Sequence, residues 1–213
     1  MIFKQYRIGD ELVSNNYLLI DKESKEAVLI DCTGDFEAVN KDLEENSAKL
    51  KYILLTHGHF DHVLACSEFK KKLNPIIVLH KDDLILIDNL KTQCGYFGIP
   101  TPEKPVIDEF IDENSELKFG NHKIKIFHTK GHTKGSLSYL IDDTLFSGDT
   151  LFYEAVGRCD LPGGDFDELT ESIVNKLYKL KPTTPVWPGH GRETTIEHEL
   201  EYNFYVGKNS RSY

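Results

Sequence analysis

Residues 54–63 read LLTHGHFDHV, and this stretch decides how the rest of the sequence is interpreted. It places three histidines and an aspartate within six residues, directly after an apolar run that is typical of a buried strand. Histidines clustered at a strand end would repel one another on protonation and would lack partners if buried. A divalent cation removes both difficulties, because it binds neutral imidazoles and attracts carboxylates.

The spacing within this stretch indicates more than one ion. His57 and His59 are two residues apart, so in an extended segment both side chains point the same way. Asp61 and His62 follow where the chain is expected to turn into a helix, and they can aim at a second point nearby. The pattern HxHxDH therefore offers ligands for two adjacent ions.

Two ions need further ligands, and three later stretches can supply them. KGHTKGS contains His132, LFSGDT contains Asp149, and PGHG contains His190. Each stretch follows a predicted strand and lies in a glycine-containing loop of the kind that carries functional residues. The full set is five imidazoles and two carboxylates, which suits zinc first, with iron or manganese as alternatives.

Composition restricts the classes of partner. The 213 residues predict a single domain over residues 1–213, and no apolar run approaches the ~20 residues that span a bilayer. The N-terminus has no secretory pattern, so we expect a cytoplasmic protein whose four cysteines are reduced. The formal charge of −10 disfavours nucleic acid, and an anionic substrate would need a local basic residue.

The hydrophobic pattern predicts alternating strands and helices. Strands are expected in residues 15–21, 26–32, 52–56, 76–80, 122–129, 136–142, 144–149 and 184–191. Helices are expected in residues 36–51, 61–73, 81–90 and 165–180, with a last polar helix near the end of the chain and a loop at 92–105. Two successive halves of this kind predict an α/β protein in which two packed sheets carry helices outside, a four-layer αββα sandwich.

The motif series THxHxDH, GHTxGS, SGDT and PGH resembles the metallo-β-lactamase superfamily, and within it the glyoxalase II-type thioester hydrolases, over about residues 15–191. The resemblance implies the same αββα fold with the metals at one edge of the sheets. It implies a first metal on His57, His59 and His132, a second on Asp61, His62 and His190, and Asp149 as a bridge. Asp31 resembles an aspartate near the metal loop of this family, where it would orient a ligand from behind, unless it is only a turn residue.

The resemblance further implies a binuclear metal-dependent hydrolase of a small thioester such as S-lactoylglutathione. A hydroxide shared by the two metals would attack the carbonyl, and Asp61 and Asp149 would position it and accept its proton. Arg158 occupies the place where the family presents a basic residue to a substrate carboxylate, with an ion pair to an aspartate as the alternative. Tyr153 is a further candidate substrate contact. Larger glyoxalase II proteins have a C-terminal helical domain and an aromatic residue where this chain has Asp160, which leaves glutathione recognition open.

Other functions remain open at this stage. A persulfide dioxygenase would use one iron held by His57, His132 and Asp149, and a lactonase would use the same hydrolytic centre. A binding module without activity is disfavoured because all seven ligand positions are filled. The acyl group, the thiol, the native metals and the oligomeric state are not determined by the sequence. We expect the remaining histidines to lie outside the centre; they are His80, His122, His128 and His198.

Overall fold

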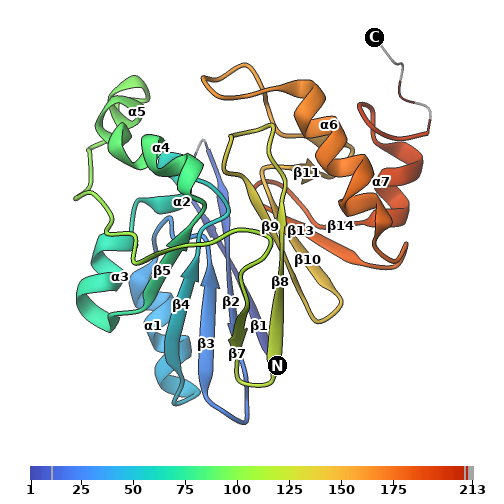
Figure 1. Cartoon of the computed structure of the whole chain (residues 1–213). Coiled ribbons are helices and arrows are strands. Elements are labelled where there is room, and N and C mark those ends of the chain that lie inside the picture. The colour runs from blue at the N-terminus through green and yellow to red at the C-terminus, as the bar shows by residue number, and fades with distance from the viewer. Residues whose placement is uncertain (11, 209, 211–213) are drawn as a thin grey trace.

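The computed structural model describes residues 1–10, 12–208 and 210; residues 11, 209 and 211–213 lie outside the described part, so the prediction of one domain over residues 1–213 extends beyond it. Two six-stranded sheets face each other, and helices lie on the outer side of each (Figure 1). Among the described residues, no helix combines the length and apolar character needed to cross a membrane.

The first sheet is antiparallel at its start and parallel at its end. Its order is β1 (Ile2–Ile8), β2 (Ser14–Ile20), β3 (Glu26–Ile30), β4 (Lys49–Leu54), β5 (Ile76–Leu79) and β6 (Glu109–Phe110). The strands from β1 to β3 pair antiparallel, and those from β3 to β6 pair parallel. Helices therefore connect the parallel strands, as parallel pairing requires.

The second sheet is mostly antiparallel. Its order is β14 (Thr194–Thr195), β13 (Pro185–Pro188), β10 (Thr144–Gly148), β9 (Leu137–Ile141), β8 (His122–His128) and β7 (Leu117–Phe119). Only β10 and β13 pair parallel. A short pair, β11 (Leu151–Phe152) and β12 (Ala155–Val156), follows the end of β10.

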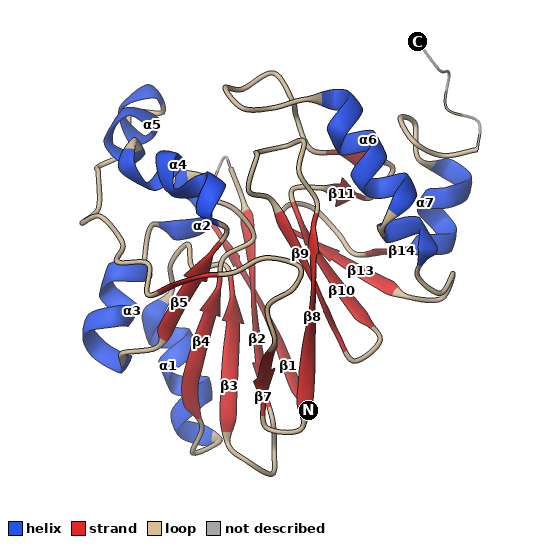
Figure 2. Ribbon diagram, in the orientation of Figure 1, coloured by secondary structure: helices blue, strands red, loops and turns tan. Residues whose placement is uncertain are grey.

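The helices form the outer layers and one edge of the molecule (Figure 2). They are α1 (Phe36–Glu45), α2 (Phe60–Val63), α3 (Cys66–Leu73), α4 (Leu84–Asp88), α5 (Leu90–Tyr96), α6 (Phe166–Asn175) and α7 (Ile196–Tyr202), with 3₁₀ turns at Lys81–Asp83 and Leu177–Lys179. In Figure 1, α1 and α3 lie outside the first sheet and α6 and α7 outside the second, while α4 and α5 lie above the first sheet.

Three apolar layers hold this arrangement together. Along β2 the side chains alternate: Leu18 and Ile20 pack with the helices outside the first sheet, whereas Tyr17 and Leu19 pack between the two sheets. The third layer lies between the second sheet and its helices, where Leu145 of β10 meets Leu169 of α6. Since each sheet is buried on both faces, the order of layers is helix, sheet, sheet, helix, and the predicted αββα sandwich is confirmed.

Several predicted boundaries are wrong. The helix expected over 36–51 ends at Glu45, because Ser47 adopts a left-handed backbone (φ 52°) and β4 starts two residues later. The helix expected over 61–73 is two helices, because the amide of Ala65 donates to Cys32 O in place of its own helix.

The remaining differences concern packing that local sequence does not reveal. The expected loop at 92–105 begins as α5, whose Cys94 packs into the core. The expected helix over 165–180 ends at Asn175 and continues as a 3₁₀ turn. The structure also contains β1, which pairs along the whole of β2 and for which the sequence analysis makes no prediction.

Candidate metal centre

Four loops meet at one edge of the two sheets. They follow β4, β8, β10 and β13, and in Figure 1 they lie at the upper edge, between α4 and α6. These loops, together with the helix α2 that the first of them enters, carry all seven of the candidate metal ligands. The loops carry His57, His59, His132, Asp149 and His190, and α2 carries Asp61 and His62. Loops at strand ends are where a rigid scaffold positions functional side chains.

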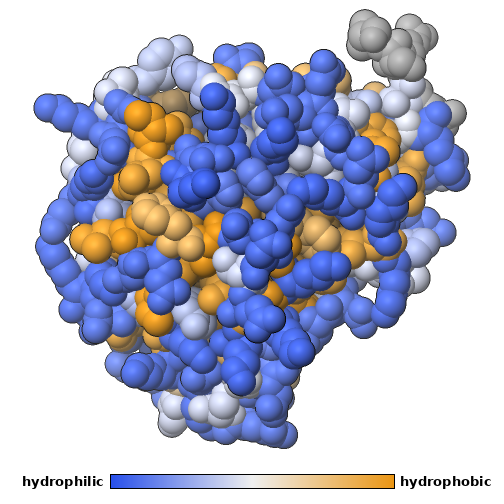
Figure 3. Space-filling model, in the orientation of Figure 1, coloured by the Kyte–Doolittle hydropathy of each residue, from blue (hydrophilic) through white to orange (hydrophobic). Residues whose placement is uncertain are grey.

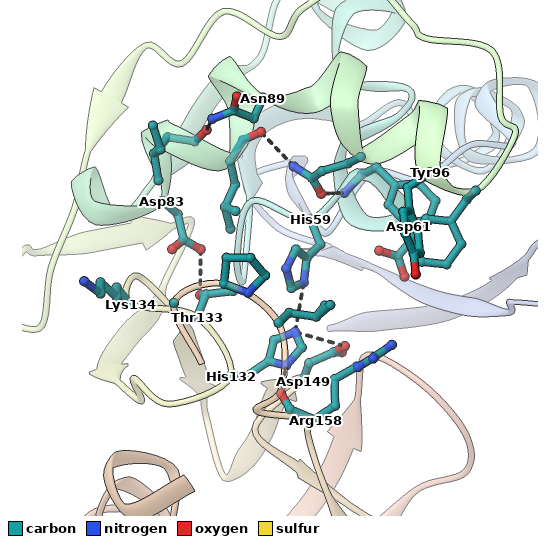
Figure 4. Close-up of a pocket in the computed structure, with 18 of the residues that line it drawn as sticks. His59, Asp61, Asp83, Asn89, Tyr96, His132, Thr133, Lys134, Asp149 and Arg158 are labelled. Atoms are coloured by element: carbon teal, nitrogen blue, oxygen red, sulfur yellow. Dashed lines mark hydrogen bonds and ion pairs between the residues drawn. The ribbon is translucent and has the colours of Figure 1, made fainter. Parts of the chain in front are cut away.

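The first group of ligands consists of three imidazoles. His59 Nδ1 lies 3.0 Å from His132 Nε2, and His132 Nε2 lies 3.3 Å from His57 Nε2. His57 and His132 are buried, and His59 is only 9% exposed. The three residues thus direct nitrogen atoms at one small volume, as His59 and His132 do in Figure 4.

The second group combines a carboxylate with two imidazoles. His190 Nε2 lies 3.2 Å from Asp61 Oδ2 and 3.4 Å from His62 Nε2. Asp149 lies between the two groups: its Oδ2 is 3.6 Å from His132 Nε2 and 3.3 Å from His190 Nε2. The structure therefore brings the predicted ligands into two adjacent groups with Asp149 in reach of both.

Hydrogen bonds behind the rings fix which nitrogen faces each group. The Nδ1 atoms of four histidines approach oxygens: Thr56 Oγ1 for His57 (3.1 Å), Asp31 Oδ2 for His62 (2.8 Å), Arg158 O for His132 (2.7 Å) and Val13 O for His190 (2.7 Å). Carbonyl and carboxylate oxygens only accept, so Nδ1 donates to them. The single hydroxyl proton of Thr56 goes to Asp31 (2.9 Å), so Thr56 accepts from His57 Nδ1. Each of the four rings consequently has Nε2 turned inward and fixed in orientation as a ligand atom.

Charge at the centre is unevenly distributed. Burial and the neighbouring imidazoles lower the pKa of His59 to about 4, and burial holds the pKa of His57 well below its usual range. Burial also lowers the pKa of His190, but Asp149 and Asp61 outweigh it and raise the value to about 11. For His62, Asp31 and the same two carboxylates outweigh burial and raise the pKa to about 9. The carboxylates thus favour positively charged rings at His62 and His190, whereas the rings of His57 and His59 in the first group stay neutral.

Two features of the structure fit a pair of divalent cations. Asp149 Oδ1 is buried and has no hydrogen-bond partner within the described part of the chain, which leaves a strong acceptor unsatisfied. A Cβ at Gly189 would lie 2.2 Å from this oxygen and 2.8 Å from the His62 ring, so glycine keeps the space beside Asp149 open. Nitrogen and carboxylate ligands in this number suit zinc, iron or manganese.

Asp31 lies directly behind the centre. Its Oδ1 accepts from the Thr56 amide (2.8 Å) and its Oδ2 from His62 Nδ1, and the carboxylate is buried. Asp31 also has a left-handed backbone (φ 57°) at the end of β3. The turn and the orienting contact, which the sequence analysis treats as alternatives, therefore coexist in one residue.

Asp83 is a functional candidate that the sequence analysis missed. Its Oδ2 accepts from the Gly58 amide (3.0 Å) and from Thr133 Oγ1 (2.8 Å), and its Oδ1 accepts from the Gly135 amide (2.7 Å). Burial raises the pKa of Asp83, and the three donors counteract it. Figure 4 shows this carboxylate beside Thr133, at the loop that carries His132. One buried carboxylate thus ties the His57–His59 loop to the His132 loop.

The reason for missing Asp83 is that its partners are far away in sequence. A signal did exist in the two ligand loops: Gly58 lies between His57 and His59, and Gly135 follows His132 by three residues. A Cβ at Gly135 would lie 2.7 Å from Asp83 Cγ, and one at Gly58 would lie 2.9 Å from Asp83 O. Both glycines allow the loops to approach the same residue closely.

The two predicted substrate contacts are placed differently. Arg158 lines a cavity of about 1030 Å³ above the ligands, but its guanidinium is held by Asp160 through two hydrogen bonds of 2.7 and 2.8 Å. Tyr153 does not line this cavity; it stacks on His198 (ring centroids 4.8 Å apart), and the Arg192 guanidinium covers its ring. Phe152, its neighbour, lines the cavity instead.

The other histidines lie outside the two ligand groups. His80 stacks on His128, His122 pairs with Asp142, and His198 pairs with Glu154. None of these four lines the cavity.

Comparison with known proteins identifies relatives over most of the chain. A family model described as the metallo-beta-lactamase superfamily matches residues 9–190, which include every candidate ligand. Hydroxyacylglutathione hydrolase GloC of Haemophilus influenzae is 34% identical over 199 residues, covering 92% of this chain and 94% of that protein. The crystal structure of BLEG-1 B3 metallo-beta-lactamase is 35% identical with a TM-score of 0.87, over 96% of this chain and 99% of that one. TTHA1623, solved in a di-iron-bound form, is 33% identical with a TM-score of 0.84, over 94% and 98% respectively.

Proposed function

The chain belongs to the metallo-beta-lactamase superfamily, and from this premise we propose that it is a metal-dependent hydrolase of a small thioester such as S-lactoylglutathione. The observation that carries the proposal is the set of inward-facing ligands: four histidines whose Nδ1 atoms are held from behind, with Asp61 and Asp149 beside them. The similarity to a hydroxyacylglutathione hydrolase supports the same reaction class.

Two groups of residues would hold the cations. His57, His59 and His132 form one, Asp61, His62 and His190 form the other, and Asp149 reaches both. Divalent cations held in this way lower the pKa of a water molecule towards ~7 and polarise a carbonyl oxygen. Zinc, iron and manganese all match the donor atoms, and the di-iron-bound form of TTHA1623 supports iron in a related protein.

The protein's own carboxylates contribute orientation and proton acceptance. Asp61 and Asp149 line the cavity floor, where their oxygens can accept hydrogen bonds from the attacking water and take up its proton. The oxygen of that water forms the new C–O bond while the C–S bond breaks, and the products are a carboxylic acid and a thiol. A thiol has an ordinary pKa of ~8.5, so the thiolate leaves without a dedicated acid. No serine or cysteine nucleophile is therefore required.

The test is hydrolysis of S-D-lactoylglutathione followed by loss of thioester absorbance. Protein loaded separately with zinc, iron and manganese should turn over, a chelated sample should not, and metal analysis should give two ions per chain. A simple unactivated thioester, S-acetyl-N-acetylcysteamine, belongs in the same assay, because it tests the reaction without testing glutathione recognition. Absence of turnover with both substrates in all metal forms would reject the proposal.

A mononuclear iron dioxygenase acting on a persulfide is the second candidate. His132 Nε2 lies 3.3 Å from His57 Nε2 and 3.6 Å from Asp149 Oδ2, so two histidines and a carboxylate converge as such an enzyme needs. One iron per chain together with oxygen uptake on glutathione persulfide would favour it over the hydrolase. Lactones and a β-lactam belong in the same panel, since the lactonase alternative and the similarity to BLEG-1 share the hydrolytic centre.

A further inference from the structure

The wall of the cavity differs in chemistry from its floor. The floor consists of the ligands His59, Asp61, His132, Asp149 and His190. Above them stands an apolar wall, by which we mean the six side chains Phe60, Ile85, Leu86, Phe97, Phe152 and Leu161. Figure 3 shows apolar side chains exposed at the surface of one face of the molecule.

Helix α4 and Phe97, the residue that follows α5, supply the side of this wall that is most exposed. On the inner side of α4 and α5, Ile87, Leu90 and Cys94 pack into the core of the first sheet. On the other side Ile85 is 61% exposed and Phe97 is 47% exposed, although both are large and apolar. A surface helix ordinarily presents polar residues to water, so apolar side chains facing a cavity indicate a ligand of similar character.

The wall is attached firmly to the metal-ligand loop. The amide of Phe60, between His59 and Asp61, donates to Gln93 Oε1 of α5 at 3.0 Å. Gln93 Nε2 donates in turn to Leu86 O of α4 at 2.7 Å, and the rings of Phe60 and Phe97 lie 4.8 Å apart. An apolar group in contact with the wall is thereby held at a fixed position relative to the floor.

The charges around the cavity do not match glutathione. At neutral pH glutathione carries two carboxylates and one ammonium group. The cations that line the cavity are Lys134 and Arg158, and Asp160 already neutralises Arg158. Only Lys134 makes no ion pair with a residue that the structure describes. A cavity of about 1030 Å³ with one unpaired cation is large but is poorly equipped to bind two carboxylates.

We propose that the apolar wall binds the acyl group of the thioester, and that the preferred acyl group is an alkyl chain of about six to ten carbons, long enough to use a cavity at the upper end of the usual size range. The inference rests on the proposed thioester hydrolysis and names its substrate class. Thiols that carry acyl groups in cells are polar, so the apolar part of such a thioester is its acyl group. The thiol part then points towards the solvent-exposed opening of the cavity. A lactoyl group of three carbons with a hydroxyl would leave most of the wall against water.

An acyl series on one small neutral thiol tests this directly. Acetyl, butanoyl, hexanoyl and octanoyl thioesters of N-acetylcysteamine are compared with S-D-lactoylglutathione on metal-loaded protein. Burying each added methylene should raise kcat/KM by about fourfold until the wall is filled. The octanoyl compound should also exceed lactoylglutathione. A flat series, or a series that falls with length, would overturn the inference.

A matched pair of variants locates the effect. Ile85 lines the cavity and Val106 does not, yet both are β-branched and 61% exposed. Ile85→Ser should lower the octanoyl-to-acetyl ratio of kcat/KM by about tenfold, whereas Val106→Ser should leave this ratio unchanged. Equal ratios in the two variants would show that the wall does not bind the chain.

Binding without turnover separates this inference from the proposed function. Acetate, hexanoate and octanoate share the carboxylate, so calorimetric titration of the metal-loaded protein should show affinity that rises with chain length. Length-dependent binding without cleavage of any thioester would reject the hydrolase and support the acyl site. Cleavage of thioesters without any dependence on length, in binding or in turnover, would reject the acyl site and support the hydrolase.

Discussion

The floor and the wall of the cavity are built on opposite principles. On the floor and directly behind it, buried polar atoms are held by hydrogen bonds. Asp31 holds His62 behind the floor, and Asp83 holds the loops that carry His59 and His132. On the wall, apolar side chains of α4 and α5 stand partly in solvent, as Ile85 does. The floor uses specific hydrogen bonds to fix a few atoms, whereas the wall offers non-directional apolar area.

This difference separates reaction class from substrate choice. Fixed ligand atoms determine which ions bind and hence what chemistry is possible, and small displacements there are costly. Apolar contacts change affinity gradually with the area that is buried. Substitutions on the floor should therefore alter metal content, and substitutions on the wall should alter KM while metal content stays constant.

The largest effect is expected from His59→Ala. It removes one of three imidazoles of the first group, so metal content should fall from two ions towards one. The kcat should fall by more than about a hundredfold, because about a hundredfold is the upper limit when only a residue that orients a metal ligand is lost. Metal analysis and turnover measure the two effects. His122→Ala is the control, because His122 pairs with Asp142 outside the centre. Two ions retained in His59→Ala would contradict the ligand assignment.

A smaller but specific effect is expected from Asp83→Asn. The new side-chain amide keeps one acceptor oxygen. Its NH₂ group, however, faces the backbone N–H of Gly58 or of Gly135, both of which donate to the carboxylate of Asp83. Affinity for the first metal should fall by about tenfold to a hundredfold, measured by competition with a chelator. The free energy of unfolding should fall by about 1–3 kcal/mol.

The control for Asp83 lies on the same segment. Asp88 is an exposed carboxylate that pairs with Lys104, so Asp88→Asn should change the free energy of unfolding by less than about 0.5 kcal/mol and leave metal affinity unchanged. A loss of stability in Asp83→Asn with normal metal affinity would mean that the carboxylate stabilises the fold without positioning the ligands.

The floor could be predicted from sequence because its pattern is local. His57, His59, Asp61 and His62 lie within six consecutive positions, and their spacing alone predicts a metal site. The fold followed from hydrophobic periodicity together with the family resemblance, and the sheets and layers agree with it. The positions of His132, Asp149 and His190 were recognisable because short glycine-containing motifs surround them.

The wall and the orienting contacts could not be predicted in the same way. Asp83 acts through partners 25, 50 and 52 residues away, and no local pattern encodes such distances. Residues 92–96 of α5 were interpreted as loop because glycine, proline and aromatic residues lie among them or follow closely, yet burial of Cys94 stabilises a helix there. Whether Arg158 is available to a substrate depends on the rotamer that brings it to Asp160, which sequence leaves open.

A moderate effect is expected beside the wall from Tyr96→Ser. Tyr96 lines the cavity and is 85% exposed, so a substrate can bury only part of its ring. KM for the octanoyl thioester should rise by about fourfold, as expected for roughly one methylene equivalent of buried area, while metal content stays at the wild-type level. Tyr202→Ser provides the comparison, since Tyr202 is an exposed tyrosine outside the cavity. A loss of metal in Tyr96→Ser would show that wall and floor are not independent.

The smallest effect is expected where the cavity lining carries charge outside the apolar wall. Because Asp160 accepts two hydrogen bonds from one edge of the Arg158 guanidinium and the pair is exposed, Arg158→Ala should change KM for S-D-lactoylglutathione by less than about twofold. Asp160→Ala releases the guanidinium and should lower that KM, since a carboxylate of the substrate can take the place of Asp160. KM values for the uncharged octanoyl thioester should not respond to either change. A large rise in KM in Arg158→Ala, confined to the glutathione thioester, would instead show that Arg158 releases Asp160 and binds the substrate. The cavity would then recognise charge as well as apolar area.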